Sequence, residues 1–214
     1  METRNSTRIC IVRHGETDWN VEKRIQGHID VPLNATGEAQ ARATAAGLTE
    51  WQFAATYSSD LIRAWRTAEI ATAERGLAVR PASGLRERHY GVLQGLTADD
   101  IRAGHPGDFE RYLARDPDCG FETGESLAAF AARVVSAIEA LALAHRGQQL
   151  LLVSHGGVLD ICYRQATGRG LRPPRDFPIP NAALNWFEVG VGGWRLIEWA
   201  DRRHLVRALE DSPE

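Results

Sequence analysis

Short apolar runs in this chain are separated by longer segments in which apolar residues recur every three or four positions. The runs Ile9–Val12, Ala54–Ser58 and Leu150–Ser154 have the length and aliphatic content of buried strands. The helical spacing is clearest over Ser126–Arg146, which predicts a helix with one apolar face. Strands that alternate with helices in this way indicate a mostly parallel sheet.

Further elements extend the same pattern. Helices are predicted over Thr36–Gly47, Asp60–Gly76 and Val158–Ala166, a short strand begins at Val79, and Ala183–Val189 and Trp194–Trp199 form a hairpin. Thr36 and Asp60 are the expected helix caps. We therefore expect one domain over residues 1–214, an α/β three-layer sandwich with helices on both faces of a mostly parallel central sheet.

Two segments interrupt this rhythm. Residues 96–124 mix charges and aromatic residues with glycines and prolines, and a long irregular segment in a compact domain is usually functional. We interpret this segment as a small irregular or helical cap over a pocket. Residues 172–180 contain four prolines and are interpreted as a rigid connector.

Composition narrows the class of protein. The 214 residues are 43% hydrophobic and carry a net charge of −3, which argues against a nucleic-acid surface. The three cysteines have no metal-like or redox spacing and suit a reducing compartment. The apolar run Ile9–Val12 is too short for a signal sequence, and we expect no stretch that approaches a membrane span. We expect a cytoplasmic protein with neither nucleic acid nor membrane as partner, and aromatic residues on the final hairpin leave a homodimer open.

Two histidines follow two of the predicted strands. His14 lies in RHGETDWN and His155 in LLLVSHGG, each directly before a glycine. Because parallel strands end at one edge of a sheet, where open α/β proteins bind ligands, both imidazoles are expected at a common site. A single histidine at a strand end is more often structural, so the neighbours of these two decide the interpretation.

Arginines provide the chemistry around these histidines. Arg13 precedes His14, Gly15 allows backbone to approach a ligand, and Arg63 projects from the helix that Asp60 is expected to cap. Nearby guanidinium groups disfavour a protonated imidazole, which keeps His14 neutral and nucleophilic. Two guanidiniums and an imidazolium, that of His155, can also neutralise a phosphoryl group without a metal, and no cofactor is expected.

Four ordered motifs are similar to those of the histidine phosphatase superfamily, the phosphoglycerate mutase-like proteins. They are RHGET, SDLIRAWRTA, LRERHYGVLQG and SHGG, and they span residues 13–157. The resemblance implies that His14 is the phosphorylated nucleophile and Glu87 the proton donor. It further implies phosphoryl or substrate binding by the remaining motif residues, namely Arg13, Arg63, His155, Asn20, Tyr90 and Gly156.

Three activities remain open at this point. The cofactor-dependent phosphoglycerate mutases resemble one another in a lysine and an adjacent arginine pair that grip the substrate's distal end. Here Ala98 replaces the lysine, and only the separated Arg111 and Arg115 are available. We therefore predict a metal-independent phosphatase of small phosphorylated metabolites, with a phosphoglycerate mutase as the alternative. A catalytically weak binding module is disfavoured because His14 and Glu87 are both present.

Overall fold

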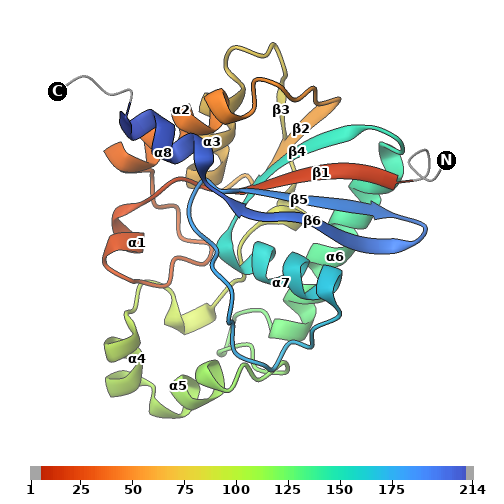
Figure 1. The fold of residues 1–214 in the computed structure, drawn as a ribbon. Coiled ribbons are helices and arrows are strands. Elements are labelled where there is room, and N and C mark those ends of the chain that lie inside the picture. The colour runs from red at the N-terminus through yellow and green to blue at the C-terminus, as the bar shows by residue number, and fades with distance from the viewer. Residues whose placement is uncertain (1–5, 211–214) are drawn as a thin grey trace.

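A six-stranded sheet forms the centre of the molecule, in the order β3-β2-β4-β1-β5-β6 (Figure 1). The computed structural model describes residues 6–210. The strands are β1 (Ser6–Arg13), β2 (Ala55–Ser58), β3 (Val79–Pro81), β4 (Gln149–Ser154), β5 (Leu184–Gly190) and β6 (Gly193–Asp201). Strands β1 to β4 run parallel, and the β5–β6 hairpin adds two antiparallel strands beside β1. The predicted mostly parallel sheet is confirmed.

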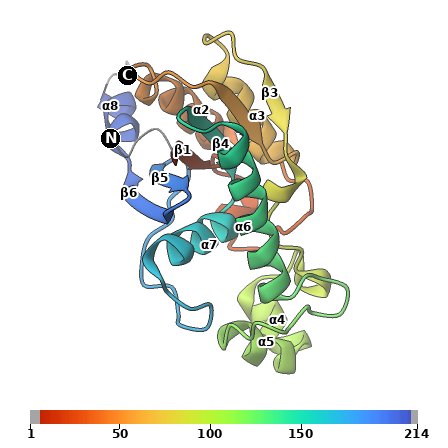
Figure 2. The same ribbon diagram turned by 90° about the vertical axis from the view of Figure 1, so that its right-hand side faces the viewer.

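Helices cover both faces of this sheet, so the predicted three-layer architecture is also confirmed (Figure 2). The α-helices of the described residues are α1 (Asp18–Val21), α2 (Ala35–Gly47), α3 (Ile62–Thr72), α4 (Ala98–Gly104), α5 (Pro106–Leu113), α6 (Leu127–Ala144), α7 (Gly156–Thr167) and α8 (Arg203–Glu210). The same residues include two short 3-10 helices, Ser83–Leu85 and Gly91–Leu93. Helices α6 and α7 pack on one face, and α2 and α3 on the other. Helix α8 lies against α2.

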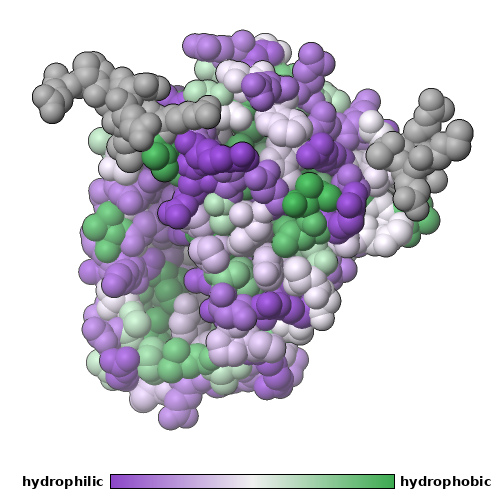
Figure 3. Space-filling model, viewed as in Figure 1, coloured by the Kyte–Doolittle hydropathy of each residue, from purple (hydrophilic) through white to green (hydrophobic). Residues whose placement is uncertain are grey.

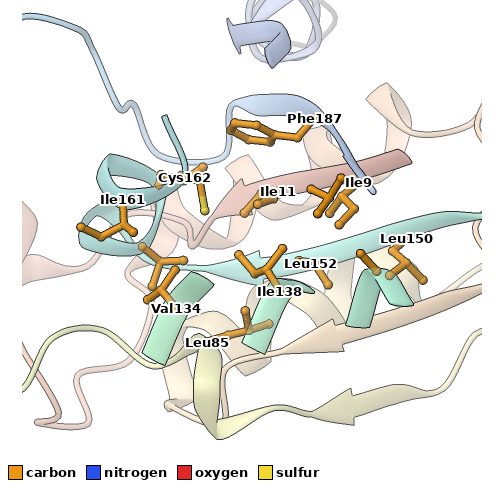
Figure 4. Close-up of a cluster of buried hydrophobic side chains, with 14 of the residues drawn as sticks. Ile9, Ile11, Leu85, Val134, Ile138, Leu150, Leu152, Ile161, Cys162 and Phe187 are labelled. Carbon is orange, nitrogen blue, oxygen red and sulfur yellow. The ribbon is translucent and has the colours of Figure 1, made fainter. Parts of the chain in front are cut away.

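Successive apolar side chains of the central strands point to opposite faces of the sheet, which explains why both faces must be covered. Leu150 and Leu152 of β4 join the hydrophobic cluster under α6 and α7 (Figure 4), whereas Leu151 and Val153 join the cluster under α3. All four side chains are inaccessible to solvent. Because each buried aliphatic side chain stabilises the fold by roughly 1.5–3 kcal/mol, neither face of β4 could stay exposed to water.

Helix α6 corrects one expectation from the sequence. It is long and apolar enough to cross a membrane, although no segment was interpreted as a span. Val134 and Ile138 are instead buried against the sheet (Figure 4), and Phe130 belongs to the same buried cluster. The same composition is found in core helices, and here one face of the helix, five of its 18 residues, is buried.

Two predicted helix caps are wrong. The side chain of Asn34, and not that of Thr36, caps α2 by accepting from the Gly37 amide at 2.8 Å. Asp60 does not cap α3, because its carboxylate pairs with the Arg86 guanidinium. The first amide of α3 donates instead to Asp30, a residue distant in sequence that local rules do not consider.

The segment over residues 96–124 is more regular than its composition indicated. It contains the short helices α4 and α5, which lie together away from the sheet in both ribbon views (Figures 1 and 2). A small cluster that includes Leu93, Ile101, Cys119 and Phe121 lies under these helices. The cap therefore has a small core of its own.

Gly15 has a different role from the one expected. A β-carbon at Gly15 would overlap the backbone of Gly37, and one at Gly37 would overlap the carbonyl oxygen of Glu16. The two glycines therefore let the loop after β1 lie directly on the first turn of α2. Close packing of two backbones, and not approach to a ligand, requires Gly15, and this contact sets the position of His14.

We predict that Gly37→Ala destabilises the protein by about 1–3 kcal/mol, because the added methyl group must displace the loop that carries His14. Gly104→Ala is the matched control, since a β-carbon at Gly104 meets nothing within 4 Å. It should change stability by no more than about 1 kcal/mol, in the stabilising direction. Urea unfolding of the two variants measures both effects, and equal midpoints would refute the packing role of Gly37.

Candidate active site

A pocket of about 580 Å³ opens at the carboxyl ends of β1 and β4. In Figure 3 the molecule is hollowed between α1 and the cap, with hydrophobic residues in the hollow and hydrophilic residues around it. Seven of the eight predicted site residues line this pocket: Arg13, His14, Asn20, Arg63, Glu87, Tyr90 and Gly156. The eighth, His155, packs beside His14 with 5.2 Å between the ring centroids. The structure thus brings the four sequence motifs together.

His14 is positioned as a neutral nucleophile. Its Nδ1 lies 2.7 Å from the carbonyl oxygen of Gly15, and because a carbonyl only accepts, Nδ1 must carry the proton. The lone pair of the neutral ring is therefore on Nε2. Burial lowers the pKa of His14 well below its usual value, and the charges of Arg63 and Arg13 lower it further. The sequence indicated the arginines, but burial contributes more.

His155 is fully buried behind His14. Burial also lowers its pKa well below the usual value, so the imidazolium expected from the sequence is replaced by a neutral ring in the structure. Its Nε2 lies 2.8 Å from the Ser59 hydroxyl. When Ser59 donates to Nε2, the ring proton of His155 is on Nδ1, which is buried and has no partner among the described residues.

Backbone carbonyl groups hold the two arginines. Arg63 is almost completely buried and donates to the carbonyl oxygens of Gly27 and Ile29 at 2.8 and 3.0 Å. Arg13 donates to Ile179 at 2.6 Å. Burial lowers the pKa of each guanidinium to about 10, which still leaves both charged at neutral pH.

Ten buried side-chain nitrogen and oxygen atoms of the described residues lack a hydrogen-bond partner, and three of them belong to residues around His14. The Nε atoms of Arg13 and Arg63 and the Nδ1 atom of His155 have no hydrogen-bond partner in the part of the chain that the structure describes. An unsatisfied buried donor costs about 1–3 kcal/mol, so a group of three near one histidine indicates a missing acceptor. A phosphoryl group has three oxygens that can accept from these donors.

Glu87 is held by the main chain. One carboxyl oxygen accepts from the Arg88 amide at 2.8 Å, and the other accepts from the Gly157 amide at the start of α7 at 2.9 Å. A β-carbon at Gly157 would overlap the Glu87 carboxyl group. The second glycine of SHGG is therefore the one that Glu87 requires, whereas Gly156 is part of the pocket lining.

The segment that carries Glu87 is supported from behind. Arg133 of α6 donates to the Glu87 carbonyl at 3.2 Å and forms two 2.7 Å hydrogen bonds with Glu125. The ring of His28 lies 2.7 Å from the same Glu87 carbonyl. These contacts fix the backbone at Glu87 independently of its side chain.

Asn20 and Tyr90 are far apart in the sequence but line the same pocket. The Asn20 Oδ1 accepts from the amide of Thr17, which leaves the Asn20 amino group for a ligand. The Tyr90 ring stacks near the Arg88 guanidinium and Phe121, and burial raises its pKa, so its hydroxyl remains a neutral donor.

Several lining residues were not identified from the sequence. Lys23 and Arg24 follow α1, Asp160 lies on α7, and Pro174 and Arg175 come from the segment interpreted as a rigid connector. That interpretation of residues 172–180 was incomplete. The topology places the residues of this segment at the site, because the antiparallel β5 begins beside the end of β1, which brings the preceding residues to the edge where His14 lies.

The cap contributes less positive charge than its two arginines suggest. Arg111 does not line the pocket and pairs with Asp116 on the surface. Arg115 lines the pocket, but its guanidinium is bound to Asp160 at 2.5 Å and to the Leu171 carbonyl at 2.7 Å. Within the described residues, no group of three or more metal-ligating side chains is placed to hold a metal ion.

Comparison with known proteins gives a consistent result. The model of the histidine phosphatase superfamily (branch 1) matches residues 9–202. Phosphoglycerate mutase-like protein 4 of Arabidopsis thaliana is 37% identical over 201 residues, which cover 92% of this chain and 86% of that protein. The metal-independent phosphoserine phosphatase of the same plant is 37% identical over 205 residues, with coverages of 93% and 83%.

A solved structure shares the fold as well. The mycobacterial glucosyl-3-phosphoglycerate phosphatase in complex with VO3 has a TM-score of 0.80 at 33% identity, covering 91% of this chain and 99% of that chain. The matched region includes all four motifs and both histidines. The chain therefore belongs to the histidine phosphatase superfamily.

Proposed function

We propose that the protein, a phosphatase of small phosphomonoesters, transfers the phosphoryl group to His14 and then to water without a metal ion. One observation carries this mechanism: three buried donors, on Arg13, Arg63 and His155, have no partner among the described residues and lie around a neutral histidine. A phosphoryl group has three oxygens, each of which can accept a hydrogen bond from one of these donors. The charge that a metal would supply comes from the two guanidiniums.

The first step forms the phosphohistidine. The lone pair on His14 Nε2 bonds to phosphorus while the bond between phosphorus and the ester oxygen breaks. The departing alcohol oxygen takes the proton that Glu87 holds when the ester binds. Arg13 and Arg63 neutralise the charge on the equatorial oxygens, where it is concentrated during transfer.

The second step returns the enzyme to its starting state. The Glu87 carboxylate takes a proton from water, whose oxygen bonds to phosphorus as the bond to His14 Nε2 breaks. The electron pair returns to Nε2, inorganic phosphate leaves, and Glu87 again carries its proton. The Arg88 and Gly157 amides hold the carboxyl group in one orientation through both steps.

The ion pair between Arg115 and Asp160 favours hydrolysis over mutase activity, because it removes a cation that could bind the substrate. A mutase must retain a phosphorylated intermediate inside a closed site and return the phosphoryl group to a second oxygen. The cap offers Ala98 without a side-chain charge, Arg111 outside the pocket, and Arg115 already paired with Asp160. Nothing in the described part of the cap supplies the cationic grip that holds such an intermediate.

Brief exposure to a labelled phosphomonoester should leave one acid-labile, base-stable phosphoryl group on His14, because Nε2 carries the lone pair of the neutral ring. His14→Ala should lose both the label and at least about 10³-fold in turnover. Mass mapping of rapidly quenched enzyme tests this assignment, with His105→Ala as the control on the cap. A label on another residue of His14→Ala would refute the proposed nucleophile.

Glu87→Gln should depress kcat for alkyl phosphates by about 10²-fold or more, because the alkoxide then leaves without a proton. Nitrophenyl phosphate, whose leaving group departs unprotonated, should lose much less in the phosphorylation step. Burst kinetics separate this step from hydrolysis of the phosphohistidine, in which Glu87 also acts. An equal loss for both esters in the burst phase would assign Glu87 a structural role.

With 3-phosphoglycerate, phosphate release should exceed formation of 2-phosphoglycerate, because the cap does not hold the intermediate away from water. The reaction should proceed unchanged in excess chelator, since Arg13 and Arg63 supply the positive charge. A free-phosphate assay run beside a coupled isomerisation assay measures both products. Isomerisation that exceeds phosphate release and is stimulated by 2,3-bisphosphoglycerate would establish the mutase alternative.

A further inference from the structure

We propose that Lys23 and Arg175 form an outer anion subsite, which selects phosphomonoesters whose alcohol part carries a carboxylate or a second phosphate. The proposal rests on the proposed function, because it concerns the other end of the same substrate. Both residues line the pocket that contains His14, yet neither belongs to the motifs that surround the phosphoryl group.

The two residues approach the pocket from unrelated parts of the chain. Lys23 follows α1 and has a positive φ of 57°, a backbone conformation that non-glycine residues rarely adopt. Arg175 follows two consecutive prolines, Pro173 and Pro174, which restrict the backbone immediately before it. Both backbones are therefore constrained where they present a cation to the pocket.

Neither cation has an acidic partner within the described residues. Of the two acidic residues that line the pocket, Asp160 is paired with Arg115 and Glu87 is bound by backbone amides. Asp176, the next residue in the chain, is paired with Arg169. Asp160 also pairs with Arg164 at 3.2 Å. Arg175 is therefore an exposed guanidinium beside carboxylates that other arginines have neutralised.

The surroundings of Lys23 follow the same pattern. Its neighbour Glu22 pairs with Arg24 at 2.6 Å, and Asp100 of α4 lies 3.5 Å from the same guanidinium. Both acidic groups therefore pair with Arg24, and none of the ion pairs among the described residues includes Lys23. The Lys23 ammonium group is thus left without a counter-charge at the entrance to the pocket.

The positive charge of Arg175 also reaches the inner part of the site. Burial is the main cause of the lowered pKa of Arg13, and the like charge of Arg175 lowers that pKa further. At Tyr112 of the cap, burial raises the pKa and the charge of Arg175 partly offsets this rise. Like charges in one pocket repel each other, and a bound anion offsets this repulsion by attracting both. A phosphoryl group on Arg13 and a second anion on Arg175 would relieve this repulsion at both ends.

The residues of this subsite do not correspond to the cap cations that bind the distal end of the substrate in the mutases. Ala98, Arg111 and Arg115 do not provide a free cation, for the reasons given above. The free cations come from the loop after α1 and from residues 172–180, on the two flanks of the cap. The predicted substrate is therefore a small dianionic-headed ester with an anionic tail, bound by exposed side chains at the mouth.

Competition against nitrophenyl phosphate tests the subsite with matched probes. Glycerol 3-phosphate and 3-phosphoglycerate differ by a carboxylate in place of a hydroxymethyl group, and 1,3-propanediol bisphosphate carries a second phosphate instead. The wild-type protein should bind at least one anionic-tailed probe about tenfold more tightly than glycerol 3-phosphate. The preferred probe identifies the second anion.

Arg175→Gln and Lys23→Gln should each reduce the affinity ratio between the preferred anionic-tailed probe and glycerol 3-phosphate by at least about threefold. The kcat for nitrophenyl phosphate should not change. Arg172→Gln is the control, because Arg172 is exposed on the same segment but does not line the pocket. The preference should also weaken as salt rises, since exposed charges are screened. Both lining residues are exposed, so these variants are expected to fold.

The subsite is overturned if the wild-type protein binds all three probes equally, or if Arg175→Gln and Lys23→Gln weaken all probes alike. Either result would leave the phosphatase mechanism intact. The mechanism fails by a different observation, namely label or turnover retained by His14→Ala. The two failures are therefore distinguishable in one set of variants.

Discussion

Burial of positive charge without a matching carboxylate is the constraint on which this structure depends. Arg63 is almost completely buried and Arg13 is partly buried, yet their first partners are backbone carbonyl groups, which orient a guanidinium without neutralising it. A buried carboxylate would stabilise them but would also occupy the phosphoryl position. The fold must therefore offset the cost of these two cations through packing elsewhere, in the two clusters that cover the sheet.

The same constraint explains why His14 remains a nucleophile. A protonated imidazole beside two guanidiniums would add a third positive charge in a region of low dielectric constant. Burial and the arginines therefore act in the same direction, and the Gly15 carbonyl then determines which nitrogen keeps its lone pair. Substrate affinity and nucleophile activation thus have one physical origin, so weakening either arginine affects both.

Much of the fold could be predicted from the sequence because its signals are local. The apolar runs of β1 and β4 and the spacing in α6 are visible within short windows, and parallel strands bring His14 and His155 to one edge. Glu87 could be identified only through the family resemblance, since neighbouring charges make it look like an ordinary surface glutamate. Its decisive contact, the Gly157 amide, is 70 residues away along the chain.

The missed features depend on contacts that no local window contains. Asp60 lost its expected capping role because Arg86 competes for its carboxylate, and Gly15 is required by Gly37 on another element. Arg175 could be placed only after β5 was known to pair antiparallel with β1. Local propensity describes elements well, but the partners of a side chain are decided by topology.

The division between inner and outer groups of the pocket has a consequence for specificity. Charge on the transferring phosphoryl group is the same for every ester, so rigid buried donors serve all substrates and act mainly on the transition state. The alcohol part differs between esters, and it meets exposed side chains such as Arg175 and Lys23 at the mouth. Exposed ion pairs contribute only about 0–1 kcal/mol each, so discrimination of this kind is modest, additive and salt-dependent, and it acts on binding more than on the chemical step.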